Sequence, residues 1–171
     1  MIPTRQVLLA ALFVWLAAVL QGRVAHAIAF RGAQPDLPLV VLSSSALLVG
    51  SLRGSLLGFW AGLLAASSFP AAYGSVFASR IVAGAFAGSL GSSLIRSNLL
   101  VPPLVTLAAT MLAESIGTLI APSFALHHSR RWLIGTGEEV LYNTVLALPV
   151  YLGLRLCRIG QLRDDPFGHR L

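Results

Sequence analysis

Charged residues are scarce in this chain, and lysine is absent. Only 11% of the 171 residues are charged and 56% are hydrophobic, and the mean hydropathy is +0.81. A soluble protein of this size could not cover so much apolar surface with polar side chains. The composition therefore predicts an integral membrane protein, and the length predicts one domain with no separate soluble part.

Cysteine and the motifs of common enzymes are also missing or nearly so. Cys157 is the single cysteine, which excludes an internal disulfide and a cysteine-based metal cluster. His127 and His128 are adjacent, but no third ligand follows at metal spacing, so neither a metal nor another cofactor is expected. The chain has no G-x-S-x-G, P-loop or H-E-x-x-H motif, and its serines lack an evident base. The sequence gives no indication of an enzyme.

Twelve arginines give the chain its net charge of +6. In a membrane protein such a surplus orients the helices, and no basic patch is interleaved with aromatic residues, so nucleic acid is not an expected partner. If both termini are inside, seven arginines lie on the inner side (Arg5, Arg53, Arg96, Arg155, Arg158, Arg163 and Arg170) and four on the outer side (Arg23, Arg31, Arg130 and Arg131). This asymmetry predicts cytoplasmic termini.

Six apolar segments are candidate membrane helices. A span needs about 20 residues, so six spans account for about 120 residues and leave short loops. The expected spans are residues 6–24, 37–51, 54–69, 73–93, 99–120 and 133–156, followed by a charged tail at 157–171. The segment 37–51 is short for a full crossing. The predicted fold is an all-α integral membrane protein built as a six-transmembrane-helix bundle.

The first segment has two interpretations. Arg5, the apolar run from Val7 to Leu20 and Ala25-His26-Ala27 imitate a secretory signal with a cleavage site. A retained first helix is the preferred interpretation, because a multi-spanning protein can insert through its first helix without a cleavable leader. Arg23 also lies very close to the possible cut.

Glycine recurs at every fourth position of one segment, at Gly50, Gly54, Gly58 and Gly62. A spacing of four advances about 400° around a helix, so these glycines form a stripe on which another backbone can approach closely. Gly84 and Gly88 repeat the spacing in the next span. We call the six glycines the glycine ladder. It is a predicted helix-packing or partner interface, and packing within the chain's own bundle is the preferred interpretation.

A turn and a helix start precede the ladder. Pro35 and Asp36 form the turn, and the Asp36 carboxylate is expected to cap the helix that follows by accepting from its first free N–H groups. Pro38 is tolerated in that first turn.

Ionisable groups inside a span cost about 2.5 to 3.5 kcal/mol each on insertion scales, so Arg80, Glu114 and Glu139 need an explanation. Arg80 either snorkels to the headgroups or pairs with one of the two glutamates, and the sequence does not choose between these. Glu139 and Asn143 share a helix face. A proton path would use such groups, but an interhelical hydrogen bond that fixes packing is the preferred interpretation.

Three stretches together resemble a known family. Gln34-Pro35-Asp36-Leu37, the ladder ending in Gly62-Leu63, and then Tyr73-Gly74 resemble the bacterial rod shape-determining protein MreD family in order and spacing. The stretch from Leu141-Tyr142-Asn143 through Pro149 to Arg155 is similar to the last helix of that family. The most specific part runs from Pro35 to Gly62. Many members carry an acidic residue soon after the Gly-Leu pair, whereas Ala65 and Ala66 follow it here, so the role of that acid is not transferred.

The resemblance implies a non-catalytic plasma-membrane component of the bacterial cell-elongation machinery. Such a protein binds MreC and helps link MreB filaments to peptidoglycan synthesis, in a complex with RodA and a penicillin-binding protein. The resemblance also implies a six-helix bundle similar to the substrate-binding subunits of vitamin transporters. The alternative is therefore a membrane-embedded substrate-binding subunit of a small-molecule transporter, which would need polar residues converging on a pocket near the outer face.

Overall fold

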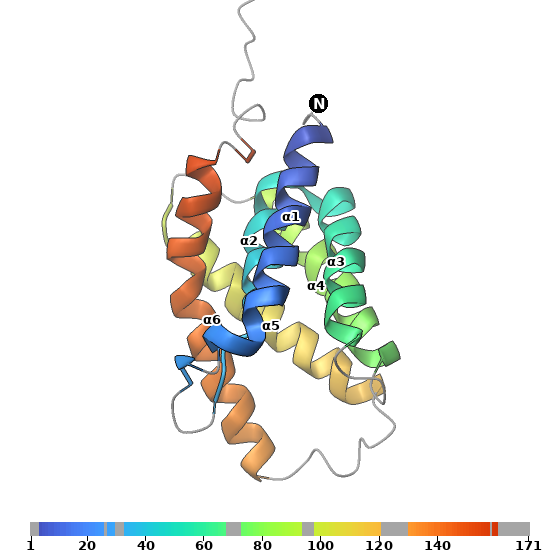
Figure 1. Ribbon diagram of the computed structural model, residues 1–171, viewed down its shortest axis with the longest axis vertical. Coiled ribbons are helices and arrows are strands. Elements are labelled where there is room, and N and C mark those ends of the chain that lie inside the picture. The colour runs from blue at the N-terminus through green and yellow to red at the C-terminus, as the bar shows by residue number, and fades with distance from the viewer. Residues whose placement is uncertain are drawn as a thin grey trace, which may run out of the picture.

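The fold is known from a computed structural model, which describes residues 4–25, 27–29, 33–67, 73–93, 98–120, 130–157 and 159–160. These residues form α-helices and one π-helical turn, and no β-strand occurs among them. The elements are α1 (Thr4–Leu20), its π-helical continuation η1 (Gln21–Ala25), α2 (Leu37–Val49), α3 (Ser51–Ala66), α4 (Tyr73–Ser93), α5 (Val101–Ile120) and α6 (Arg130–Leu156). Successive α-helices run in alternating directions (Figure 1). The all-α prediction is confirmed.

Three predicted boundaries differ from the structure by three residues. The helix expected at 54–69 is α3 at Ser51–Ala66, because the connection expected between residues 51 and 54 lies at Gly50. The last helix begins at Arg130, three residues before the expected start at 133, because Arg130 and Arg131 continue the helix instead of ending the loop. The predictions for residues 121–129, which include His127 and His128, and for the tail 161–171 lie outside the described residues.

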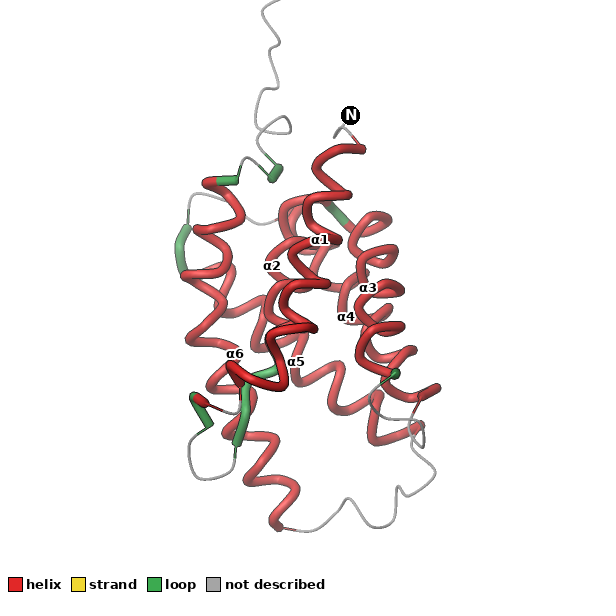
Figure 2. Tube along the Cα trace, viewed as in Figure 1, coloured by secondary structure: helices red, strands yellow, loops and turns green. Residues whose placement is uncertain are grey.

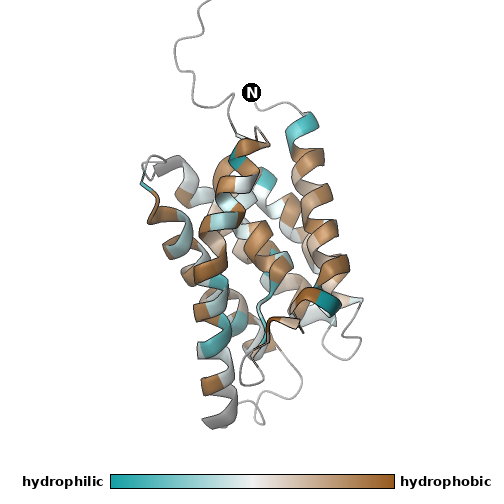
Figure 3. Cartoon of the chain, turned by 60° about the vertical axis from the view of Figure 1, so that its left-hand side comes forward, coloured by the Kyte–Doolittle hydropathy of each residue, from teal (hydrophilic) through white to brown (hydrophobic). Residues whose placement is uncertain are grey.

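Two helical segments of the described chain are long and apolar enough to cross a membrane, Thr4–Ala25 and Val101–Ile120. The hydrophobic colouring covers most of the helix ribbon, and hydrophilic residues gather in the first half of α6 (Figure 3). Large apolar side chains such as Leu8, Leu104 and Val145 are exposed at the periphery. These features support membrane association.

Helix α2 lies at the centre of the bundle and packs against all five other α-helices. Eleven of its thirteen residues are buried. At 1.5 Å per residue it is about 20 Å long, shorter than a hydrocarbon core of about 30 Å. The other helices surround α2 on every side, so its polar ends are covered by protein.

Gly50 alone joins α2 to α3. Its N–H donates to the Ala46 carbonyl at 2.8 Å, and its carbonyl accepts from the Gly54 N–H at 2.7 Å. Its backbone has φ 93° and ψ 172°, a conformation that only glycine adopts readily. The two helices can therefore follow each other without a loop, which explains why the connection comes earlier than predicted.

Replacing Gly50 with alanine is expected to destabilise the fold by about 1 to 3 kcal/mol, because the added Cβ makes this conformation unfavourable. The free energy of unfolding, measured by SDS titration from mixed micelles, checks this. Gly137→Ala is the control. A Cβ at Gly137 meets nothing within 4 Å, so this change should be neutral or slightly stabilising. Equal effects of the two substitutions would contradict the conformational argument.

The glycine ladder lies in the contact between α3 and α4 of the same chain. A Cβ built on Gly54, Gly58 or Gly84 would lie under 3.0 Å from a backbone carbonyl oxygen of the facing helix. One built on Gly62 would lie 3.0 Å from the Phe77 oxygen, and one on Gly88 would lie 2.6 Å from the Gly50 oxygen. Helices α3 and α4 share the most extensive helix contact of the bundle and run side by side (Figure 2).

Gly91 extends this contact and was not singled out from the sequence. A Cβ there would lie under 3.0 Å from the Leu47 carbonyl oxygen of α2. Gly91 follows Gly88 by three residues, whereas the ladder has a spacing of four, so the pattern did not include it. The other glycines of α4 were the sequence feature that could have indicated it.

Candidate functional site

The chemically distinctive feature is a part-buried ion pair between Arg80 of α4 and Asp36 at the start of α2. The Arg80 Nη2 donates to Asp36 Oδ2. Arg80 is only 8% exposed. Both expectations for Arg80 were therefore wrong: it neither snorkels nor pairs with Glu114 or Glu139.

The glycine ladder explains why Arg80 reaches Asp36. A Cβ on Gly58 would collide with the Arg80 carbonyl oxygen, so the absence of a side chain at Gly58 lets this part of α4 lie against α3. Because α4 also packs against α2, the Arg80 side chain turns inward, toward the helix start where Asp36 lies.

Asp36 also caps the N-terminus of α2. Its Oδ1 accepts from the Leu39 N–H at 2.9 Å, and Pro38 occupies the first helical turn. The predicted cap is confirmed. Pro35 is buried immediately before it. A carboxylate at a helix N-terminus is also favoured by the helix dipole, so one side chain stabilises α2 and neutralises Arg80.

Asn143 of α6 forms hydrogen bonds with α5 and with the start of α2, beside the Asp36–Arg80 pair. Its Oδ1 accepts from the Asp36 N–H at 2.9 Å, and its Nδ2 donates to Thr110 Oγ1 of α5 at 3.4 Å. Asn143 is fully buried. The predicted interhelical hydrogen bond is confirmed for Asn143.

Gln21 completes the support of the turn. Its Nε2 donates to the Pro35 carbonyl at 2.8 Å, and its Oε1 accepts from the Leu37 N–H at 2.8 Å. Sequence reasoning missed this residue. The sequence feature that could have indicated Gln21 is its position, since a polar amide follows directly on the apolar run that ends at Leu20.

Glu114 of α5 and Glu139 of α6 stand at the edge of the site. Both side chains are half-buried, and both interact electrostatically with Arg80 and Asp36 and with each other. Within the described part of the chain, neither forms an ion pair with Arg80. Among these residues no group of three potential ligands is placed to hold a metal ion.

Asn143→Leu is expected to destabilise the fold by about 1 to 3 kcal/mol, since the Asp36 N–H would lose its acceptor with little change in side-chain volume. Unfolding by SDS titration measures this. The control is Thr144→Val, because the Thr144 hydroxyl bonds only its own helix, at the Val140 carbonyl. If Asn143→Leu lowered the free energy of unfolding no more than Thr144→Val does, the hydrogen bonds of Asn143 would not contribute to stability.

Comparisons of this chain with protein-family models, with curated proteins and with solved structures find no match. The likeness to the MreD family therefore rests on the residues quoted from the sequence, and the site is interpreted from its own chemistry.

Proposed function

We propose that this chain is a non-catalytic, multi-pass scaffold of the bacterial plasma membrane that serves the cell-elongation machinery. In this role it binds MreC and helps link MreB filaments to peptidoglycan synthesis. The observation that carries the proposal is that the segment with the family-like pattern, Pro35 to Gly62, is also the segment around which the bundle is built. It supplies the Asp36 cap, the enclosed helix α2 and half of the α3–α4 contact.

The proposed topology has six spans with both termini in the cytoplasm. The first residues of α1 and the last residues of α6 lie at the same end of the bundle (Figure 1). The Gly160 N–H donates to Gln6 Oε1 at 2.9 Å across this end. Ends on one side fit an even number of crossings, and the arginine excess on that side favours a cytoplasmic location for both termini.

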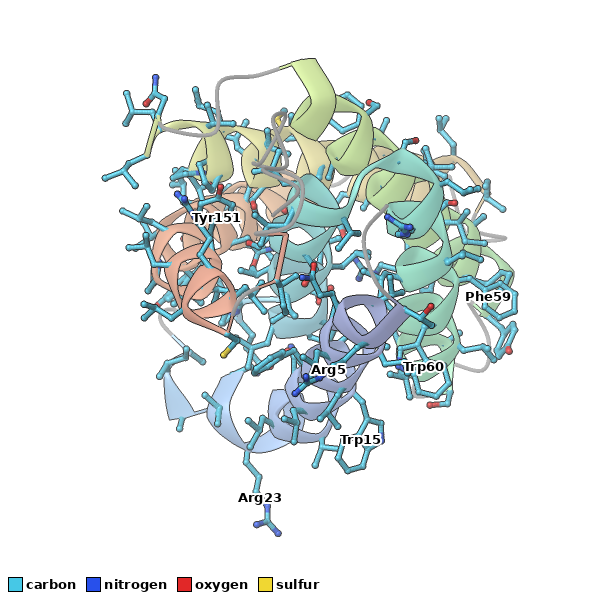
Figure 4. All side chains as sticks on the ribbon, turned by 90° about the horizontal axis from the view of Figure 1, so that it is seen from above. Arg5, Trp15, Arg23, Phe59, Trp60 and Tyr151 are labelled. Carbon is cyan, nitrogen blue, oxygen red and sulfur yellow. The ribbon has the colours of Figure 1, made fainter. Side chains whose placement is uncertain are left out.

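A partner helix would dock outside the glycine ladder, because the ladder already lies inside the contact between α3 and α4. One apolar surface available to lipid or protein lies between α1 and α3. There, Trp15 and Trp60 line a shallow hollow with Ala11 and Leu12, and the Trp60 Nε1 donates to the Ala11 carbonyl at 3.2 Å. Figure 4 shows the two tryptophans at the outer side of the bundle.

Detergent co-purification from the native host, followed by identification of the recovered proteins, tests the proposal. We expect MreC, with other elongation proteins at lower yield. The Trp60→Ala variant tests whether this surface contributes to capture, and Leu104→Ala, an exposed change on α5, is the matched control. Recovery of the coupling subunit of a vitamin transporter, with no cell-wall protein, would refute the scaffold role.

The alternative function, a substrate-binding subunit of a small-molecule transporter, is favoured by one observation. Polar side chains from α4, α5 and α6 converge near the start of α2, toward the end of the bundle opposite the first residues of α1 and the last residues of α6. In the proposed orientation this is the outer end. The co-purification experiment separates the two functions by the partner that it recovers.

A further inference from the structure

An exposed row of side chains on α1 leads from the start of the helix to the hollow between α1 and α3. Its members follow one another at intervals of three or four positions, which places them on one face of the helix: Arg5, Leu8, Leu12 and Trp15. All four are exposed. This face of α1 is therefore not covered by the part of the chain that the structure describes.

Helix α3 carries a matching row, formed by Arg53, Leu56 and Trp60 at intervals of three and four. Leu56 and Trp60 are exposed, and Arg53 is half-buried. Helices α1 and α3 run in the same direction, since successive helices alternate (Figure 1). Each row therefore leads from an arginine near one end of the bundle to a tryptophan of the hollow. Neither helix contains an acidic residue.

One hydrogen bond fixes the two rows relative to each other. The Trp60 Nε1 donates to the Ala11 carbonyl at 3.2 Å. Arg5 lies six residues before Ala11, and Arg53 lies seven residues before Trp60. At about 1.5 Å per residue, both arginines lie about 10 Å from the hollow along the helix axes, at nearly the same level. Figure 4, which looks down on this end, shows Arg5, Trp15 and Trp60 on the same side of the bundle.

The two parts of this surface suit two different chemical groups. Arginine side chains bind phosphate oxygens strongly. A guanidinium has five N–H donors, so Arg53 can bind such an oxygen beside the interaction that it already makes. The hollow is lined by apolar side chains and suits hydrocarbon. In a bilayer the headgroup region is about 5 to 8 Å thick on each side, so a distance of about 10 Å leads from the phosphates to the acyl chains.

We propose that one anionic phospholipid binds along α1 and α3, with its phosphate at Arg5 and Arg53 and an acyl chain in the hollow. A zwitterionic lipid would bring a cation to the arginines, and a soluble anion would leave the hollow empty. Basic residues between helices on the cytoplasmic side are typical of sites for anionic headgroups, and the proposed orientation puts this end there. The inference rests on the proposed membrane placement of the chain and is independent of a role in cell elongation.

Quenching of tryptophan fluorescence by brominated lipid tests the proposal, because bromine on an acyl chain quenches only the tryptophans that it contacts. The full-length chain carries Trp132→Phe, so that Trp15 and Trp60 alone report. It is reconstituted in phosphatidylcholine vesicles with a small and equal fraction of dibrominated phosphatidylglycerol or dibrominated phosphatidylcholine. We expect about a tenfold preference for phosphatidylglycerol. Equal quenching by the two lipids would overturn the proposal, whether the hollow is then left to bulk lipid, to a second copy or to a partner helix.

Variants separate this surface from the overall charge of the same end. Arg5→Gln and Arg53→Gln should each reduce the preference by about threefold to fivefold. Arg155→Gln is the matched control. Arg155 lies in the last turn of α6 at the same end, with its Cζ 5.9 Å from the centroid of the Tyr151 ring, so its loss should leave the preference nearly unchanged. A loss as large with Arg155→Gln as with Arg5→Gln would refute the site. Recovery of MreC is measured separately, so either result leaves the scaffold proposal to its own test.

Discussion

Gly58→Leu is expected to destabilise the bundle by about 3 kcal/mol or more, at the upper end of what overpacking costs. Even the first added carbon would lie under 3.0 Å from the Arg80 carbonyl oxygen, which is backbone and cannot move aside alone. Helices α3 and α4 would have to separate along their whole contact. The separation would also pull Arg80 away from Asp36. The free energy of unfolding from mixed micelles, together with recovery of monodisperse protein, measures the effect.

Gly153→Leu is the matched control for this substitution. Gly153 is also a helical glycine, but it is exposed and a Cβ there meets nothing within 4 Å. The same change of residue should therefore cost little at position 153. If the two variants unfolded alike, close backbone contact would not be the reason for the ladder.

Asp36→Asn is expected to lower the free energy of unfolding by about 3 to 5 kcal/mol, because it leaves the Arg80 charge buried without its counter-ion. Asparagine keeps a side-chain oxygen for the Leu39 N–H, so the loss reports on charge and not on capping. The measurement is again unfolding by SDS titration.

A double-mutant cycle identifies the cause. Asp36→Asn combined with Arg80→Gln should be more stable than Asp36→Asn alone, because the second change removes the orphaned charge. Arg23→Gln controls for loss of a positive charge, since Arg23 is exposed and points away from the bundle (Figure 4). Strictly additive effects of the two site substitutions would show that the pair is not energetically coupled.

The local features of this site could be predicted from the sequence, because they depend on residues close together in the chain. Apolar runs mark the helices, a regular glycine spacing marks a close-packing face, and an aspartate before Leu37 marks a cap. Each follows from backbone geometry within one or two turns.

The partner of Arg80 could not be predicted in the same way. Asp36 already had a complete explanation as a cap, and 44 positions separate it from Arg80. Glu114 and Glu139 are equally acidic and lie inside predicted spans. Only the packing of α4 against α2 decides among the three. In that packing Gly91 of α4 lies against the Leu47 carbonyl of α2, a contact that the regular glycine spacing did not indicate.

If the chain has the proposed six-span topology, the enclosure of α2 also constrains how it would enter the membrane during synthesis. Helix α2 is made early, yet it is short, has almost no surface for lipid, and carries Ser43, Ser44 and Ser45 in its buried middle. Three of the helices that cover it, α4, α5 and α6, are made later. Left alone in lipid, α2 would span too little of the bilayer and expose its serines. We expect α2 to remain within the insertion machinery, or in the company of α3 to which Gly50 joins it, until the later helices arrive and Arg80 meets Asp36.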